Sequence, residues 1–138
     1  MDFDLDLARE QSDKNPVYYV QYAHARIVSI LRKVGTNKNF APKILHFALL
    51  IHPSEIALIK EIVRLPDLVA RIAKNYEVHH LTTYAKELAA AFHAFYRDCR
   101  VISEDKELTL SRIALCRATQ IALANTLRLM GISAPEKM

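Results

Sequence analysis

The sequence predicts an all-α protein, a helical bundle of about five to six helices. Apolar residues recur at steps of three and four along most of the 138 residues, which is the spacing of core-facing helical stripes. The chain contains only two glycines, Gly35 and Gly131, and both directly follow long periodic segments, where a helix favours a left-handed residue. A chain of this length can build a core without disulfides or metal, so one domain is the simplest organisation.

Residues 1–14 are predicted to form a polar lead-in. Asp2-Phe3-Asp4-Leu5-Asp6-Leu7 alternates with period two, which suits a short strand or an extended strap. Five acids against two bases leave this segment at −3, so residues 15–138 carry +7, given the net charge of +4. A basic body suits a polyanionic partner and is equally compatible with solubility alone.

The first strong helix is predicted over residues 16–34. Asn15 is a favoured N-cap and Pro16 a favoured first helical residue. At about 100° per residue, Tyr19, Tyr22 and Arg26 fall within roughly a 60° arc of this helix. Its core-facing stripe is formed by Val20, Ala23, Ile27, Ile30, Leu31 and Val34.

Three shorter helices are predicted in the middle of the chain. One lies within 40–51 and is interrupted by a proline. The other two span 53–64 and 66–76, because Pro53 and Pro66 each stand where a helix can start, with an acid close behind. The apolar faces of these two helices are formed by Ile56, Ile59 and Val63, and by Leu68, Val69, Ile72 and Tyr76.

Two long helices are predicted in the second half. The helix over 78–99 carries an apolar stripe, and a charged turn at 103–107 leads to the last helix, 107–130. The last helix is apolar on most sides, so we expect it to lie centrally in the bundle. The stripe of the 78–99 helix consists of Leu81, Tyr84, Leu88, Phe92, Phe95 and Cys99.

The histidines, cysteines and serines show no arrangement typical of a metal or catalytic site. None of the six histidines stands in an HExxH motif or a comparable spacing with a carboxylate. Two isolated glycines cannot form a phosphate loop, and no serine or cysteine stands in a nucleophile motif. We therefore expect no catalysis, no metal and no cofactor in this chain alone.

Cellular location is predicted from the cysteines and from the hydropathy pattern. Cys99 and Cys116 lie in separate predicted helices without a CxxC pattern, which favours a reduced, intracellular protein. The sequence shows neither a basic-then-apolar leader nor an apolar run of membrane-spanning length, which favours a soluble protein that is not exported.

One segment combines aromatic rings with a cation. Two flat π-faces beside a planar guanidinium, as in Tyr19, Tyr22 and Arg26, can stack on and hydrogen-bond an unpaired base. The alternative is that these tyrosines lie at the edge of the core and the arginine is a solvated surface group. A second aromatic and basic group closes the 78–99 helix and is displaced from its core stripe: Tyr96, Arg97 and Arg100.

The order of these segments resembles the C-terminal anticodon-binding domain of class I arginyl-tRNA synthetases, a helical bundle of the type called DALR. The resemblance covers essentially the whole chain, and Gln21-Tyr22-Ala23-His24-Ala25-Arg26 is its most specific element. Residues 2–8 resemble the segment that follows the catalytic domain, and 15–26 the first helix of the anticodon domain. Further resembling segments are 65–66, 81–96, 111–131 and the ending 133–138, with Lys137 where many members carry arginine.

The resemblance implies a role in tRNA recognition. In that family the parent enzyme uses ATP to attach arginine to its tRNA, in a Rossmann-type domain whose HIGH and KMSK-like motifs do not occur here. It therefore implies an excised domain, with 1–14 as a lead-in from the missing catalytic domain, 15–138 as the anticodon-binding domain, and Met1 as an introduced start. The implied partners are tRNA-Arg and the catalytic domain. ATP would bind only in the parent, and the domain would be a cytoplasmic monomer without membrane contact.

The genetic code indicates what such a domain must read. Every arginine anticodon has C in the middle, so we expect a tight pocket for that base and a looser grip on its neighbours. The resemblance places five residues at the pocket: Tyr19, Tyr22, Arg26, Tyr96 and Met138. The further candidate RNA contacts are Gln21 and, for phosphates, Arg97, Arg100 and Lys137.

Two other functions stay open from the sequence. One is a helical protein-interaction module whose exposed tyrosines meet a partner protein. The other is the anticodon domain of a different class I synthetase, such as the cysteine enzyme, against which the run at 21–26 argues.

Overall fold

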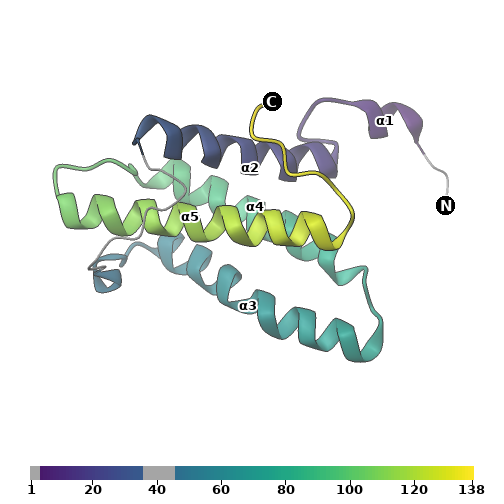
Figure 1. Ribbon diagram of the computed structural model, residues 1–138. Coiled ribbons are helices and arrows are strands. Elements are labelled where there is room, and N and C mark those ends of the chain that lie inside the picture. Colours follow the sequence, from purple (N-terminus) through teal and green to yellow (C-terminus); the bar gives the residue numbers. More distant parts are fainter. Residues whose placement is uncertain (1–3, 36–45) are drawn as a thin grey trace.

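The computed structural model describes residues 4–35 and 46–138, and within these ranges it is all-α, without strands (Figure 1). This confirms the predicted fold class. The elements are α1 (Leu5–Arg9), α2 (Pro16–Lys33), the 3₁₀ turn η1 (Phe47–Leu49), α3 (Pro53–Asn75), α4 (His80–Asp98) and α5 (Lys106–Leu129). Of the helix predicted within 40–51, residues 40–45 lie outside the described ranges, and the described part holds only η1.

α2 begins where the sequence predicts because Asn15 caps its first turn. The Asn15 side-chain oxygen accepts the N–H groups of Val17 and Tyr18 at 3.1 and 3.4 Å. These are two of the donors that a helix start leaves without a partner. The Asn15 amide nitrogen donates to the carbonyls of Ala8 and Glu10 at 3.1 and 3.0 Å, so the same side chain ties the preceding segment to α2.

The prediction of a strand or extended strap is wrong for residues 5–9, which form α1. The Asp4 carboxylate accepts the N–H groups of Asp6 and Leu7, both at 3.0 Å, and so caps the helix. A strand needs a neighbour to pair its backbone donors and acceptors, and the described ranges contain none. Because α1 buries none of its residues, local capping decides its conformation.

α3 is one continuous helix, so its predicted division into 53–64 and 66–76 is wrong. Pro66 lies inside it, where a proline removes a backbone hydrogen bond and costs about 3 kcal/mol or more. Buried residues on both sides of this proline, Leu58 before and Leu68 after, join the same hydrophobic core, and α3 packs along α4. This shared packing surface outweighs the local penalty.

The apolar face predicted for the first half of α3 is turned largely to solvent. Ile56 and Val63 are 41% and 66% exposed, and Ile59 packs against the core only partly. The core side carries the carboxylate of Glu55 instead, which apolar spacing cannot predict. Tyr76, predicted on the second apolar face, is 83% exposed and ends α3 with a left-handed backbone (φ +61°).

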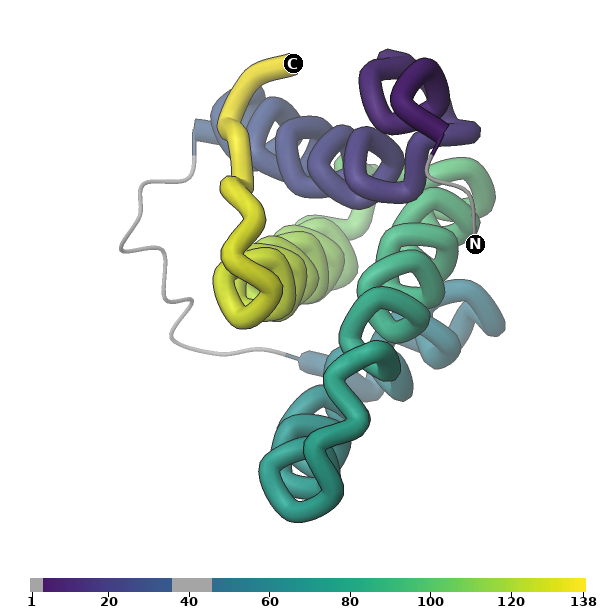
Figure 2. Tube along the Cα trace, turned by 90° about the vertical axis from the view of Figure 1, so that its right-hand side faces the viewer, coloured from purple at the N-terminus to yellow at the C-terminus, as the bar shows by residue number. Residues whose placement is uncertain are grey.

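α5 lies centrally, as predicted, and contacts α2, α3, α4 and η1 (Figure 1). In Figure 2 it is seen nearly end-on beneath α2, with α4 beside it. Phe92 and Phe95 of α4 are fully buried in the shared core, which confirms their predicted positions. Their packing fixes the end of α4 against α2 and brings Tyr96 to the edge of the bundle.

The two glycines adopt the predicted left-handed conformation. Gly35 and Gly131 have φ values of +72° and +71°. After Gly131 the tail, residues 132–138, runs back across α2 without helix or strand (Figures 1 and 2).

A buried ion pair joins α3 to α5. Glu55 is 1% exposed, and its Oε1 lies 2.6 Å from the Nε of Arg112, whose side chain is 13% exposed. Glu55 Oε2 accepts the N–H of His52 at 2.9 Å, and Arg112 Nη1 donates to the carbonyl of Arg100 at 2.7 Å. The network thus supplies Glu55 with the partners that a buried charge requires.

Replacing Arg112 by methionine should destabilise the protein by about 3–5 kcal/mol, because it leaves the Glu55 carboxylate buried without its cation. Urea unfolding measures this change, and the double variant Glu55→Leu/Arg112→Met should recover most of the loss. Glu87→Gln is the matched control, since its pair with Arg64 is exposed and is worth about 0–1 kcal/mol. A loss no larger for Arg112→Met than for Glu87→Gln would contradict the assignment.

Candidate functional site

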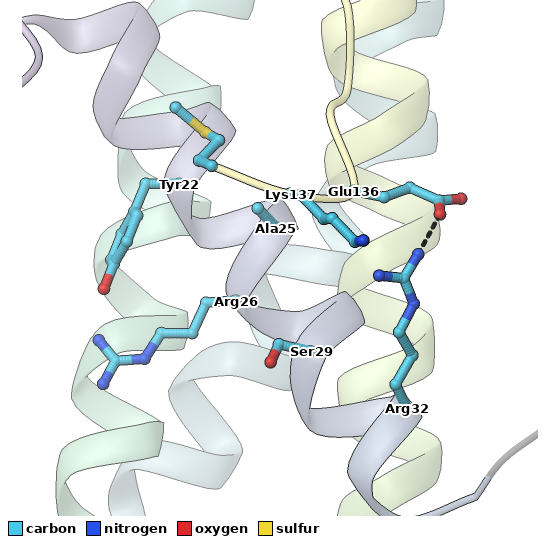
Figure 3. Close-up of a pocket in the computed structure, with 8 residues that line it drawn as sticks. Tyr22, Ala25, Arg26, Ser29, Arg32, Glu136 and Lys137 are labelled. Atoms are coloured by element: carbon cyan, nitrogen blue, oxygen red, sulfur yellow. Dashed lines mark hydrogen bonds and ion pairs between the residues drawn. The ribbon is translucent and has the colours of Figure 1, made fainter.

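A surface pocket lies between α2 and the tail (Figure 3). Its volume is about 410 Å³. Helix α2 supplies one wall and the tail supplies the other, so the pocket joins segments far apart in the sequence. The lining residues are Tyr22, Ala25, Arg26, Ser29 and Arg32 from α2, and Glu136, Lys137 and Met138 from the tail.

Arg26 lies between two tyrosine rings from different helices. Its guanidinium carbon is 4.4 Å from the ring centroid of Tyr96 on α4 and 5.7 Å from that of Tyr22 on α2. Contacts of this kind are attractive because the ring face is electron-rich. Tyr22 and Tyr96 are 38% and 37% exposed, so each ring retains accessible surface. Three of the five predicted pocket residues are thereby held in one group, and Met138 lines the same pocket as Tyr22 and Arg26.

Tyr19 supports this group from the side of the core. It packs partly against the hydrophobic core, and its ring centroid is 5.1 Å from that of His93. Burial, and then the nearby Asp13, raise the pKa of its hydroxyl. Tyr19 opens onto a smaller hollow of about 210 Å³ that it shares with Asp13, Tyr18 and Tyr22. The structure therefore places Tyr19 beside the main pocket and not in its lining.

His93 belongs to the aromatic and basic segment that closes the predicted 78–99 helix, but the sequence reasoning did not select it as a site residue. It lies on α4 with its ring centroid 6.2 Å from that of Tyr22, and the two ring planes are inclined by 27°. Its Nε2 is buried and has no hydrogen-bond partner among the described residues. Burial, and then the charge of Arg26, lower the pKa of the imidazole. A histidine three residues before Tyr96 on the same helix was the available signal, because that spacing places both on one face.

The predicted phosphate contacts do not all lie at the same place. Lys137 lines the main pocket, whereas Arg97 and Arg100 line a second hollow of about 510 Å³ between the ends of α2 and α4. Arg97 Nε is 2.7 Å from a carboxylate oxygen of Asp98, and hydrogen bonds from Arg97 and Ser54 lower the pKa of Asp98 to about 2.

Two further α2 residues contact the tail. Gln21 Nε2 donates to the carbonyl of Ser133 at 2.9 Å, which occupies the side-chain amide in a contact with the tail. The contact of Gln21 with RNA stays a prediction. Arg32, which the sequence reasoning did not select, forms an ion pair with Glu136 at the pocket (Figure 3).

The described ranges show no sign of a metal site, a disulfide or a membrane-spanning helix. They contain no group of three or more histidine, cysteine or acidic side chains placed to hold a metal ion. Cys99 and Cys116 are buried and form no disulfide, and burial raises the pKa of the Cys116 thiol to about 12. None of the described helices is long and apolar enough to cross a membrane.

The fold and this pocket define an all-helical domain with an aromatic and cationic surface site. Its sequence is similar to that of known proteins along its whole length. An arginine–tRNA ligase of Dehalococcoides mccartyi is 52% identical over 138 residues, covering 100% of this chain and 25% of the relative. One of Heliobacterium modesticaldum is 49% identical over 144 residues, covering 100% of this chain and 26% of the relative.

Solved structures give the same result. The arginyl-tRNA synthetase of Thermus thermophilus matches 100% of this chain and 24% of its own, with a TM-score of 0.81 and 35% identity. That of Plasmodium falciparum matches 99% of this chain and 23% of its own, with a TM-score of 0.78 and 31% identity. The sequence profile of the DALR anticodon binding domain matches residues 20–138, and the chain belongs to that family. It spans about a quarter of the length of the curated relatives.

Replacing Arg26 by methionine should raise the pKa of His93, because it removes the positive charge that disfavours a second one nearby. The pKa of His93 should still stay below 6.5, because burial is the larger cause of the shift and is not removed by the substitution. An NMR titration of the imidazole measures both points. Arg97→Met is the control, because Arg97 does not contribute to this shift, and an equal response of both variants would refute the explanation.

Stability should fall as the pH drops below about 6.5, in part because His93 resists protonation in the folded state. The unfolded chain takes up this proton near pH 6.5 and the folded chain only at lower pH, so acid favours unfolding across that interval. His93→Phe should therefore lose less stability than the parent chain between pH 7 and pH 5. Parallel urea unfolding curves at several pH values measure the difference, and identical pH profiles would contradict it.

Proposed function

We propose that this domain binds the anticodon loop of tRNA-Arg and holds the middle cytosine in the pocket between α2 and the tail. The observation that carries the proposal is the placement of Arg26 between Tyr22 and Tyr96, beside a pocket that Met138 also lines. Exposed rings can stack on a base that is splayed out of the loop, and a guanidinium can bond its edge. Membership of an anticodon-binding family supports the same ligand.

The pocket offers a physical basis for choosing cytosine. Cytosine presents N3 and O2 as acceptors on its Watson–Crick edge, and the Arg26 guanidinium has only donors. Uracil presents an N–H at the same N3 position, which would face these donors without a bond. Leaving a donor unsatisfied in a pocket costs more free energy than an average hydrogen bond contributes. Binding of the wrong base is therefore weakened.

Cations around the pocket suit the phosphate backbone. Arg32 and Lys137 line the pocket itself, and Arg97 and Arg100 lie at the neighbouring hollow. Such contacts add affinity that falls with salt and does not depend on sequence. Arg97 is already paired with Asp98 and Arg32 with Glu136, so we assign the larger share to Lys137 and Arg100.

The proposed parent is an ATP-dependent arginine–tRNA ligase of the cytoplasm. The relatives are named arginine–tRNA ligases, and this chain corresponds to about a quarter of each. In the proposal, residues 1–14 lead in from the catalytic domain and 15–138 form the anticodon-binding domain. ATP and arginine chemistry belong to the catalytic domain, and this domain positions the tRNA as a monomer.

An arginine anticodon stem-loop should bind this chain, and replacing its middle C by U should weaken binding at least tenfold, because Arg26 loses an acceptor. Fluorescence anisotropy with a labelled stem-loop measures both affinities. A stem-loop with a cysteine anticodon also has C in the middle, so competition between the two stem-loops tests the grip on the neighbouring bases, and we expect a preference for the arginine stem-loop. Equal affinity for C and U, or no binding at moderate salt, would overturn the proposal.

Tyr22→Ala and Tyr96→Ala should each weaken stem-loop binding about tenfold or more, since one base stack contributes about 1–3 kcal/mol. Tyr76→Ala is the matched control, because this tyrosine is 83% exposed and ends α3 away from the pocket lining. Anisotropy titrations at two salt concentrations distinguish base stacking from phosphate contacts, because only the affinity from phosphate contacts falls steeply with salt. Tyr22 lines the pocket, and Tyr96 lines the neighbouring hollow and reaches the site through its contact with Arg26. A loss in the control equal to the loss in Tyr22→Ala and Tyr96→Ala would contradict the assignment.

A further inference from the structure

The two walls of the pocket, α2 and the tail, are held in place by different kinds of contact. The wall from α2 belongs to an 18-residue helix, which backbone hydrogen bonds hold along its length. The tail has neither helix nor strand, and one backbone bond, from Ile132 N–H to the carbonyl of Leu127 at 2.9 Å, ties its first residue to α5. Because ordering each residue of a chain costs conformational entropy, the tail needs other contacts to keep its place.

Apolar packing anchors only the first part of the tail. Ile132 and Ala134 pack against the hydrophobic core. The pocket lining begins two residues later, at Glu136, and continues through Met138, which is 51% exposed. The lining residues therefore depend on further contacts that hold the tail before it reaches the pocket.

Two side chains of α2 supply those contacts. Gln21 Nε2 donates to the carbonyl of Ser133 at 2.9 Å and lies 3.2 Å from its hydroxyl oxygen. His24 is 4% exposed, and its Nδ1 lies 2.9 Å from the carbonyl oxygen of Pro135. A carbonyl oxygen only accepts, so His24 holds a proton on Nδ1 and donates it. Pro135 has no N–H, so its carbonyl is the one backbone group through which this residue can be held.

The ion pair between Arg32 and Glu136 is the weaker tie. Their side chains are 48% and 56% exposed, and exposed ion pairs contribute little to stability. By helical geometry Gln21 and His24 lie on a stripe of α2 next to the pocket stripe of Tyr22 and Arg26, so they can hold the tail without entering the pocket.

We propose that Gln21 and His24 are positioning residues, which hold the tail across α2 so that Lys137 and Met138 line the RNA pocket. Neither side chain lines that pocket. Their effect on RNA affinity acts through the tail, because RNA binds more tightly to the fraction of molecules in which the tail is docked. The inference rests on the proposed function for its RNA readout, and the docking of the tail itself is measured without RNA.

The first measurement is the ¹³C-methyl NMR signal of Met138 in the RNA-free protein. His24→Leu and the double variant Gln21→Ala/His24→Leu should narrow and shift this signal towards that of a mobile methionine. Met130, which packs against the core, is the internal control for an intact fold. His24→Asn keeps a side-chain N–H donor and should restore much of the docked signal, whereas His80→Leu, whose ring faces Glu77 at 3.4 Å, should leave it unchanged.

The second measurement is stem-loop affinity in two chains, the full chain and one ending after Ile132. In the full chain the double variant should weaken binding about tenfold, since each lost hydrogen bond changes an equilibrium by roughly two- to tenfold. In the shortened chain, which already binds more weakly, the same substitutions should change affinity less than twofold. This non-additivity is the signature of residues that act through the tail.

Several outcomes would overturn the inference. An unchanged Met138 signal in the double variant would show that other contacts hold the tail. An equal loss of affinity in the full and shortened chains would show that Gln21 and His24 act on RNA or on α2 directly. A released tail with unaltered RNA affinity would show that the tail is not part of the site. If the unsubstituted chain binds no stem-loop, the proposed function fails, and the methyl signal still decides whether these two residues hold the tail.

Discussion

The rotation of α2 about its own axis is the constraint on which the site depends, because this helix serves three surfaces at once. One stripe, with Val20, Ile27 and Leu31, is buried in the core. A second, with Gln21 and His24, contacts the tail, and a third carries the pocket side chains. With about 3.6 residues per turn the stripes are adjacent, so a rotation of one residue would move every side chain to the wrong surface. The Asn15 cap and the packing of α2 on α4 and α5 fix that rotation.

Local signals in the sequence predict helix ends well where no distant contact opposes them. Asn15 and Gly131 act as the sequence predicts, because capping and a left-handed turn need only neighbouring residues. Pro66 does not, because α3 packs along α4 on both sides of it. Glu55 could not be predicted on the core side of α3, since its partner Arg112 lies 57 residues further along the chain. The errors therefore fall where tertiary contacts outweigh local preference.

The candidate site was predictable only in part for the same reason. Helical spacing places Tyr22 and Arg26 on one arc, the family resemblance adds Tyr96, and the structure shows the Tyr96 ring against the same guanidinium. Spacing cannot show that His93 lies under the tyrosine rings, because that contact joins α2 to α4. It cannot show the tail contact of Gln21 either, since its acceptor is 112 residues away. Within one helix the prediction holds, and between helices it needs the fold.

The separation of 112 residues between Gln21 and Ser133 also has a consequence for the order of folding. Contacts between distant parts of a chain close late, because the loop entropy must be lost before they form. The core of α2, α4 and α5 does not include the lining residues of the tail, so it can assemble before the pocket is complete. Full affinity for RNA would then arise as the last step of folding, and a chain that lost its final residues would be stable yet bind RNA weakly.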